Sequence, residues 1–220
     1  MKRIKLILLF TLLVNISSAQ VVNFENVTLE TKNSIQASFS VDLAALINIE
    51  YGRVISIKNN PFILSANVGL PFGEIISDDY KIVMNISGNI SKRKNWTLPA
   101  HIGLFNNRTK NSMNSVASSG FRLSITPGYY KKSWFVASEI AYEKFLLTHI
   151  ENSEFYKKVY YAEAKDGWYK NSGGNIHFGI ITGKTINKGE LNLKFGLQTT
   201  ENLNQVLVPY YVQIGYKHWF

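Results

Sequence analysis

Apolar and polar residues alternate with a period of two along most of the chain from Ile35 onward. In the stretch IQASFSVD, the apolar residues Ile35, Ala37, Phe39 and Val41 occupy one side of an extended strand, and polar residues occupy the other. Alternation of this kind over four to eight residues predicts a β-strand with one apolar face. Ten segments follow the pattern: 35–42, 46–57, 62–70, 81–90, 97–105, 121–130, 134–145, 176–184, 191–198 and 210–220.

The alternation fits two architectures, because a soluble β-sandwich buries its apolar faces whereas a membrane β-barrel turns them toward lipid. The connections between the segments help to distinguish the two. Those after the second, fourth, sixth and eighth segments contain little more than KNN, SKRKN, KKS and NKG. Those after the third, fifth and seventh are longer, and they run over Pro71–Asp79, Asn106–Ser118 and Thr148–Gly173. The first connection, near DLAA, is an exception because it is also short. Membrane barrels have short turns on one side and longer loops on the other.

We therefore predict an all-β fold, an antiparallel up-and-down transmembrane β-barrel of about ten strands. Eight strands remain an alternative if the first two segments form one bent strand and one later segment is not a strand. A soluble β-sandwich is the rival fold, and it predicts release of the protein from the cell without detergent.

The first 20 residues, MKRIKLILLFTLLVNISSAQ, are typical of a secretory signal peptide. Three basic residues are followed by an apolar run from Leu6 to Val14 and then by small residues up to Ala19. The run is too short for a membrane-spanning helix, which needs roughly 20 apolar residues. Cleavage after Ala19 divides the chain into a signal peptide, residues 1–19, and one barrel domain, residues 20–220.

Composition narrows the classes of function. The chain of 220 residues has a formal net charge of +9, and without Lys2, Arg3 and Lys5 it keeps 21 basic against 15 acidic residues, a net charge of +6. So mild an excess does not predict a nucleic-acid partner. The absence of cysteine excludes disulfides and thiolate chemistry. The four histidines are scattered without ligand spacing, so we predict neither a metal nor a cofactor.

The last segment ends on an aromatic residue within the alternating pattern. It resembles the C-terminal insertion signal of Gram-negative outer-membrane β-barrel proteins, a small porin-like family, in which a polar residue, a glycine and a terminal aromatic stand at fixed offsets. Gln213, Gly215 and Phe220 match these positions. The resemblance implies location in the outer membrane, contact with its lipid, recognition by the barrel-assembly machinery, and pairing of the last strand with the first.

Aromatic residues gather near the strand ends that adjoin the short connections, where membrane barrels carry girdles at headgroup level. Strand propensity alone also favours aromatic residues. The residues concerned are Trp96, Tyr129, Tyr130, Trp134, Tyr216, Trp219 and Phe220.

Charged residues recur on the predicted inward faces of the strands. If Lys131 and Lys132 form a two-residue turn, Arg122 lies opposite Ala141 and diagonal to two glutamates on the next segment. Because a narrow barrel is filled by its own side chains and unpaired buried charges are costly, we predict a paired interior network. An ion path or a catalytic carboxylate is the alternative. The network residues are Glu50, Arg122, Glu139, Glu143 and Lys194.

The connection Thr148–Gly173 combines aromatic and charged residues, a composition that suits contacts with a polypeptide or a glycan. Its candidate contact residues are Tyr160, Tyr161, Trp168 and Tyr169. The alternative interpretation is that these rings pack the loop onto itself or extend the flanking strands above the membrane.

No segment forms a recognisable enzymatic motif. We predict an integral outer-membrane barrel with a structural, surface-contact or accessory role, in preference to an enzymatic one. A narrow pore is one alternative. A lipid-modifying hydrolase is another, because His149, Glu151 and Ser153 are the one close group of residues that could serve acyl transfer.

Overall fold

The computed structural model describes residues 21–30, 32–41, 45–72, 78–204, 206 and 208–220. The predicted signal peptide, residues 1–19, lies outside the described residues. In chain order the elements are β1 (Asn33–Val41), β2 (Ala45–Ile57), β3 (Asn60–Pro71), β4 (Tyr80–Arg93), β5 (Trp96–Lys110), β6 (Asn114–Ile125), β7 (Gly128–Lys131), β8 (Trp134–Asn152), α2 (Glu154–Val159), β9 (Gly167–Ile186), β10 (Gly189–Thr200) and β11 (Tyr210–Trp219).

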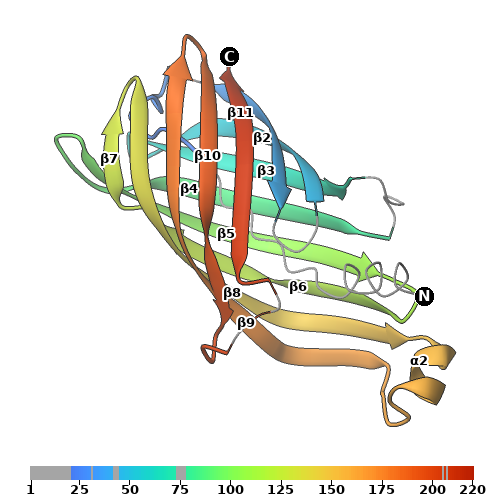
Figure 1. The fold of residues 1–220 in the computed structure, drawn as a ribbon. Helices are drawn as coiled ribbons and strands as arrows, with labels where there is room; N and C mark the ends of the chain where they lie inside the picture. The colour runs from blue at the N-terminus through green and yellow to red at the C-terminus, as the bar shows by residue number, and fades with distance from the viewer. Residues whose placement is uncertain (1–20, 31, 42–44, 73–77, 205, 207) are drawn as a thin grey trace.

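The strands form one antiparallel sheet that closes on itself as a barrel (Figure 1). Each strand pairs with the next one in the chain except β6 and β7, which both pair with β5 and β8. β1 pairs with β11 from Ser34 opposite Trp219 to Val41 opposite Val212. Closure leaves no free sheet edge among the described strands, as the predicted pairing of the first and last strands requires. The all-β up-and-down barrel is therefore confirmed.

The barrel wall has ten positions around its circumference, although the sheet contains eleven strands. β6 and β7 share one position between β5 and β8, separated by Thr126 and Pro127. Proline lacks the N–H group that a ladder requires, which accounts for the interruption. The register with β8 continues across this interruption. Ile125 of β6 lies opposite Ile140 of β8, and Gly128 of β7 lies opposite Ala137 of β8. Ten strands were predicted, and the single segment 121–130 is in fact two.

The side-chain pattern of the wall is the reverse of that in a soluble sandwich. Along β1, Ile35 and Phe39 are exposed on the outside, while Gln36 and Ser38 are buried inside. The same inversion recurs in β2, β3, β4, β8, β10 and β11, where alternate residues are buried and exposed. The interior is thus largely polar, and the outer wall is largely apolar.

The two ends of the barrel differ in their connections. At one end, β2–β3, β4–β5, β7–β8 and β9–β10 are joined by two-residue turns, and the C-terminus lies at the same end. At the opposite end β8 and β9 continue as a hairpin that carries α2 and projects beyond the barrel (Figure 1). No helix in the described part of the chain is long and apolar enough to cross a membrane.

Two of the predicted long loops are wrong in extent. The interval Asn106–Ser118 belongs mostly to β5 and β6, which leave only residues 111–113 between them. The interval Thr148–Gly173 loses its ends to β8 and β9, so the connection is residues 153–166. In both places polar residues continue the ladder beyond the apolar wall, because backbone pairing does not require apolar side chains.

Candidate functional site

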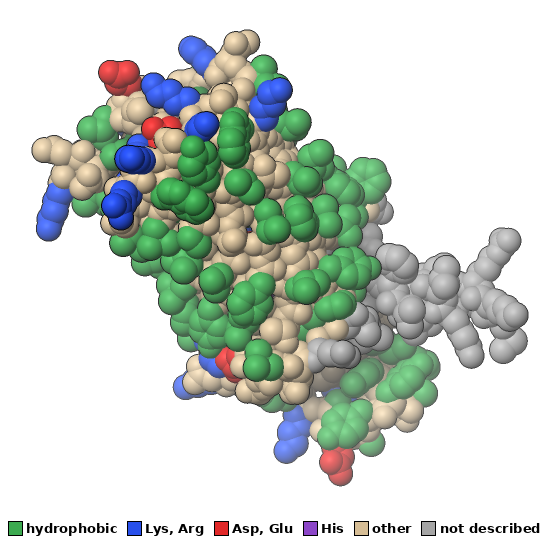
Figure 2. All heavy atoms as spheres, turned by 60° about the vertical axis from the view of Figure 1, so that its left-hand side comes forward, with side chains coloured by type: hydrophobic (Ala, Val, Ile, Leu, Met, Phe, Trp, Pro, Cys, Tyr) green, Lys and Arg blue, Asp and Glu red, His purple; other side chains and the backbone are tan. Residues whose placement is uncertain are grey.

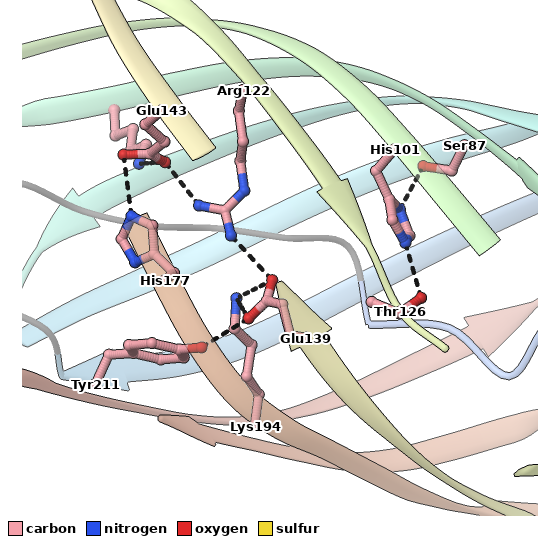
Figure 3. Close-up of polar contacts among 10 residues, drawn as sticks. Ser87, His101, Arg122, Thr126, Glu139, Glu143, His177, Lys194 and Tyr211 are labelled. Carbon is pink, nitrogen blue, oxygen red and sulfur yellow. Dashed lines mark hydrogen bonds and ion pairs between the residues drawn. The ribbon is translucent and has the colours of Figure 1, made fainter. Parts of the chain in front are cut away.

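A buried charged network inside the barrel joins β6 to β8 (Figure 3). The Arg122 guanidinium donates through Nη1 to Glu143 Oε1 at 2.7 Å and through Nη2 to Glu139 Oε1 at 2.9 Å. The three side chains are at most 3% exposed. Glu139 and Glu143 are four residues apart in one strand, so both point inward. One arginine thereby bridges two carboxylates that would otherwise repel each other.

The expected position of Arg122 relative to β8 is wrong by two residues. Arg122 lies directly opposite Glu143, and the residue opposite Ala141 is Ser124. The cause is the turn, because Lys131 already pairs with Trp134. The turn therefore consists of Lys132 and Ser133.

Two further strands contribute to the same network. Lys194 Nζ in β10 lies 3.0 Å from Glu139 Oε1 and 2.9 Å from Oε2, and the Tyr211 hydroxyl in β11 donates to Glu139 Oε2 at 2.8 Å. Glu139 thus receives bonds from three strands besides its own, an arrangement that fixes its side chain across the lumen. Of the predicted interior residues, the structure brings Arg122, Glu139, Glu143 and Lys194 together.

Lys81 and His177 complete the network around Glu143, and sequence reasoning missed both. Lys81 Nζ is 3.7 Å from Glu143 Oε1, and His177 Nε2 is 3.6 Å from Glu143 Oε2. Each is buried between two less buried neighbours in its strand, so strand parity could have identified both.

Glu50, the fifth predicted interior residue, forms an ion pair with Lys217. Lys217 Nζ in β11 lies 2.9 Å from Glu50 Oε1, and both side chains are buried. β1 separates the two strands, so the pair crosses one intervening strand.

The end of the lumen beside the short turns is filled by an N-terminal segment, residues 21–27, that sequence reasoning left without a role. Val21, Val22, Phe24 and Val27 are buried in one apolar cluster with residues from the barrel wall. The Phe24 ring packs edge-on against Tyr130 and His101, at centroid distances of 6.4 and 5.6 Å. The wall contributes Ile63, Tyr130, Phe135, Ala137, Ile181 and Trp219 to this cluster.

Polar contacts attach the same segment to the wall. The Asn23 backbone N–H donates to Glu190 Oε2 at 3.0 Å, and Asn23 Nδ2 donates to the Lys131 carbonyl at 2.7 Å. Asn26 Nδ2 donates to Thr185 Oγ1 at 2.9 Å. Residues 21–27 therefore form a plug, which we call the N-terminal plug.

The plug corrects part of the predicted aromatic girdle. Tyr130 and Trp219 are buried inside the barrel, where they contact the plug cluster. Trp96, Tyr129 and Trp134 do lie on the outer wall near the short turns, with ring centroids 5.7 Å apart for Trp96 and Tyr129 and 5.6 Å apart for Tyr129 and Trp134. Of the seven residues in the predicted girdle, two are therefore buried in the lumen and five are not.

The projecting hairpin carries the four candidate contact residues in two places. Tyr160 and Tyr161 follow α2 at its tip, whereas Trp168 and Tyr169 belong to β9, opposite His149 and Thr148. All four side chains are exposed. The Trp168 ring packs on His149 at a centroid distance of 4.6 Å.

The three residues weighed as an acyl-transfer group do not form one. His149 Nδ1 is 3.7 Å from Glu151 Oε1 on an exposed part of β8. The Ser153 hydroxyl instead caps α2, accepting a hydrogen bond from the Tyr156 N–H at 3.1 Å. A nucleophile needs a base within hydrogen-bond reach, whereas the contact of the Ser153 hydroxyl is the backbone N–H of Tyr156.

The hairpin tip is held by a small polar cluster. Asp166 accepts hydrogen bonds from Lys157 Nζ at 2.7 Å and from the Asn152 N–H at 2.8 Å. The hydrogen bond from Lys157, followed by those from Asn152, lowers the pKa of Asp166 to about 2.

The pKa of Asp166 is lower in the folded tip than in an unfolded chain. Ionised Asp166 therefore stabilises the folded tip fully above about pH 4, and this stabilisation is lost as the pH falls through about 2. We expect hydrogen exchange of the Asn152 amide to be unchanged between pH 7 and pH 5, after correction for the intrinsic rate. Asp166→Asn is expected to accelerate that exchange without changing the heat resistance of the barrel. An equal exchange rate in the variant would contradict this role.

The residues of the predicted insertion signal lie on the closing strand. Gln213 points inward and its Nε2 donates to Ser38 Oγ at 3.1 Å. A Cβ at Gly215 would lie 2.7 Å from Ser38 Cβ, so the close approach of β11 and β1 favours glycine there. Phe220 is exposed, and its backbone exchanges two hydrogen bonds with Asn33 at 2.9 Å.

Comparison with known proteins gives likeness of fold only. No protein-family model matches the chain, and no curated protein sequence matches it. Among solved structures, the outer membrane protease OmpT from Escherichia coli has 9% identity and a TM-score of 0.36, covering 86% of this chain and 94% of its own. The NanC porin has 6% identity and a TM-score of 0.37, with coverages of 84% and 98%. The β-domain of the Bordetella autotransporter BrkA has 9% identity and a TM-score of 0.39, with coverages of 86% and 100%.

Because these identities and TM-scores are low, we assign the fold from the strand pairing of the chain itself. The activities of those three proteins are not transferred to it.

Proposed function

We propose that the chain is an integral outer-membrane β-barrel with a structural and surface-contact role. The observation that carries this proposal is the inverted wall, with large apolar side chains exposed around a buried charged interior. Met84 and Leu104, for example, are 60% and 64% exposed in mid-strand. Soluble monomers rarely expose so continuous an apolar surface, whereas lipid requires one. Figure 2 displays hydrophobic side chains over the middle of the wall, with Lys and Arg gathered at its upper end.

The proposed orientation has the short turns facing the periplasm and the β8–β9 hairpin facing outward. Support comes from the connections, since membrane barrels have short periplasmic turns and longer external loops. The outward rings of Trp96, Tyr129 and Trp134 adjoin the short turns, a height that suits the headgroup interface. In this scheme the signal peptide directs export, and the assembly machinery recognises β11 through Gln213, Gly215 and Phe220.

The proposed role is surface contact through the hairpin, not transport through the lumen. The buried charges of Arg122, Glu139 and Glu143 are paired with one another, and the N-terminal plug fills the short-turn end. The hairpin presents exposed aromatic rings among charged residues, a surface that suits a protein or glycan partner. The rings are Phe155, Tyr160, Tyr161, Trp168 and Tyr169.

Membrane fractionation tests the proposal directly. We expect the protein to sediment with outer membranes, to require detergent for extraction, and to run faster on a gel before boiling than after. Its apolar wall would otherwise be in contact with water. Recovery of a stable monomer in aqueous buffer without detergent would contradict membrane insertion.

Conductance in planar bilayers separates surface contact from a narrow pore. We expect the inserted wild-type protein to give no single-channel currents, because a barrel of this size is filled by its own side chains and here also by the plug. Discrete conductance steps that persist in purified, singly inserted protein would favour the pore.

A further inference from the structure

A groove lies on the outer wall near the short turns, where β8, β9, β10 and β11 run side by side. Its volume is 690 Å³. The side chains that shape it are Trp134, Thr182, Lys184, Leu191, Leu193 and Ile214. The groove is therefore apolar along its length, with one lysine among its lining side chains.

The groove exists because a short side chain stands among long ones. Thr182 points outward from β9 between Val136 of β8 and Leu193 of β10, its two cross-strand neighbours. The Thr182 hydroxyl donates to the Phe135 carbonyl at 2.8 Å, so its polar atom is satisfied by the backbone and does not require water. A depression of this kind on a lipid-facing wall can accommodate an acyl chain.

A row of outward side chains crosses the end of the groove nearest the short turns. Trp134 is the cross-strand partner of Lys131 on one side and of Lys184 on the other. Lys131 Nζ lies 5.7 Å from the centre of the Trp134 ring and 5.5 Å from that of Tyr129. Two cations thus flank one tryptophan at the proposed height of the lipid headgroups, an arrangement complementary to a phosphate.

We propose that this groove is a binding site for an anionic phospholipid, with one acyl chain along Thr182 and the phosphate between Lys131 and Lys184. The proposal rests on the proposed membrane insertion. The apolar lining selects a hydrocarbon chain, and the two lysines select the charge of the headgroup. The site would hold one lipid of the periplasmic leaflet against the wall at β7–β11.

Native mass spectrometry of the full chain released from detergent micelles tests the site. The probes are phosphatidylglycerol and phosphatidylcholine with identical acyl chains. We expect the wild type to retain one phosphatidylglycerol in preference to phosphatidylcholine. The double variant Lys131→Gln/Lys184→Gln should reduce that preference by about 10- to 30-fold. Thr182→Phe, which fills the groove, should lose retention of both lipids.

Matched controls separate the groove from general effects. Ala66→Phe adds the same ring at an exposed position on β3, and Lys58→Gln/Lys94→Gln removes two charges from other short turns. Both controls should retain phosphatidylglycerol as the wild type does. Heat-modifiable gel mobility is measured first on every variant, so that a variant that does not fold is recognised. If Thr182→Phe does not fold, the lipid preference of the lysine double variant tests the site.

Four results would overturn the site. Wild-type retention in folded Thr182→Phe would exclude the groove, and wild-type preference in the lysine double variant would exclude the headgroup contact. A protein dimer that is lost in Thr182→Phe would assign the groove to a second copy of the chain. A barrel that inserts normally but shows no lipid preference overturns this inference alone, whereas a wild type recovered without detergent overturns membrane insertion as well.

Discussion

Replacing Arg122 with methionine is expected to lower the free energy of unfolding by about 3–5 kcal/mol, the cost of leaving a buried charge without its partner. Arg122 donates to both Glu139 and Glu143, and all three side chains are buried. Without Arg122 the two buried carboxylates lose a positive charge and a hydrogen bond each. The measurement is the temperature at which the folded gel band disappears in detergent, together with urea unfolding in micelles. Unchanged heat resistance of Arg122→Met would contradict a stabilising network.

Two matched variants show whether the effect comes from buried charge. Arg53→Met removes an arginine from the exposed side of β2 and is expected to change the free energy of unfolding by no more than about 0.5 kcal/mol. Arg122→Met/Glu143→Gln removes one charge of each sign and should recover part of the loss, because an uncharged pair carries a smaller desolvation cost. Absence of recovery would indicate that packing of the arginine side chain dominates.

The sequence was sufficient to predict the wall and much of the network because strand parity is a local property. Once Leu123 and Val136 are assigned to the outside, Arg122 and Glu139 must point inside. The partner of each residue is less certain, because it depends on which two residues form the turn. The error of two positions opposite Arg122 arose entirely at Lys131–Ser133.

The loop boundaries and the plug could not be predicted in the same way. β5 and β6 extend over Asn106–Lys110 and Asn114–Ser118 with polar residues, where no apolar face distinguishes a strand from a loop. The segment VVNFENV has no alternation of its own, and its burial depends on residues far away in the chain, such as Phe135 and Trp219. Trp219 could have been placed inside, since it shares the strand face of Gln213 and Lys217.

The plug gives the second large effect. Phe24→Ala is expected to lower the free energy of unfolding by about 3–5 kcal/mol, the range for removing a buried phenyl ring. Phe24 is 4% exposed and contacts Tyr130 and His101, and Tyr130 in turn stacks on Phe135 at a centroid distance of 5.3 Å. The cavity left by the ring would therefore lie inside the largest apolar cluster of the lumen, where polar neighbours cannot fill it.

The matched control is Phe155→Ala on α2, because Phe155 is 55% exposed and should tolerate the change within about 0.5 kcal/mol. Heat resistance and near-ultraviolet circular dichroism report on the two variants, since only Phe24→Ala disturbs the stacked pair of Tyr130 and Phe135. Glu25 of the plug pairs with Lys92 of β4 at 2.7 Å. We expect a glutamate-specific protease to cleave after Glu25 faster in Phe24→Ala than in the wild type. Equal heat resistance and equal cleavage in the two variants would mean that residues 21–27 do not occupy the barrel in solution.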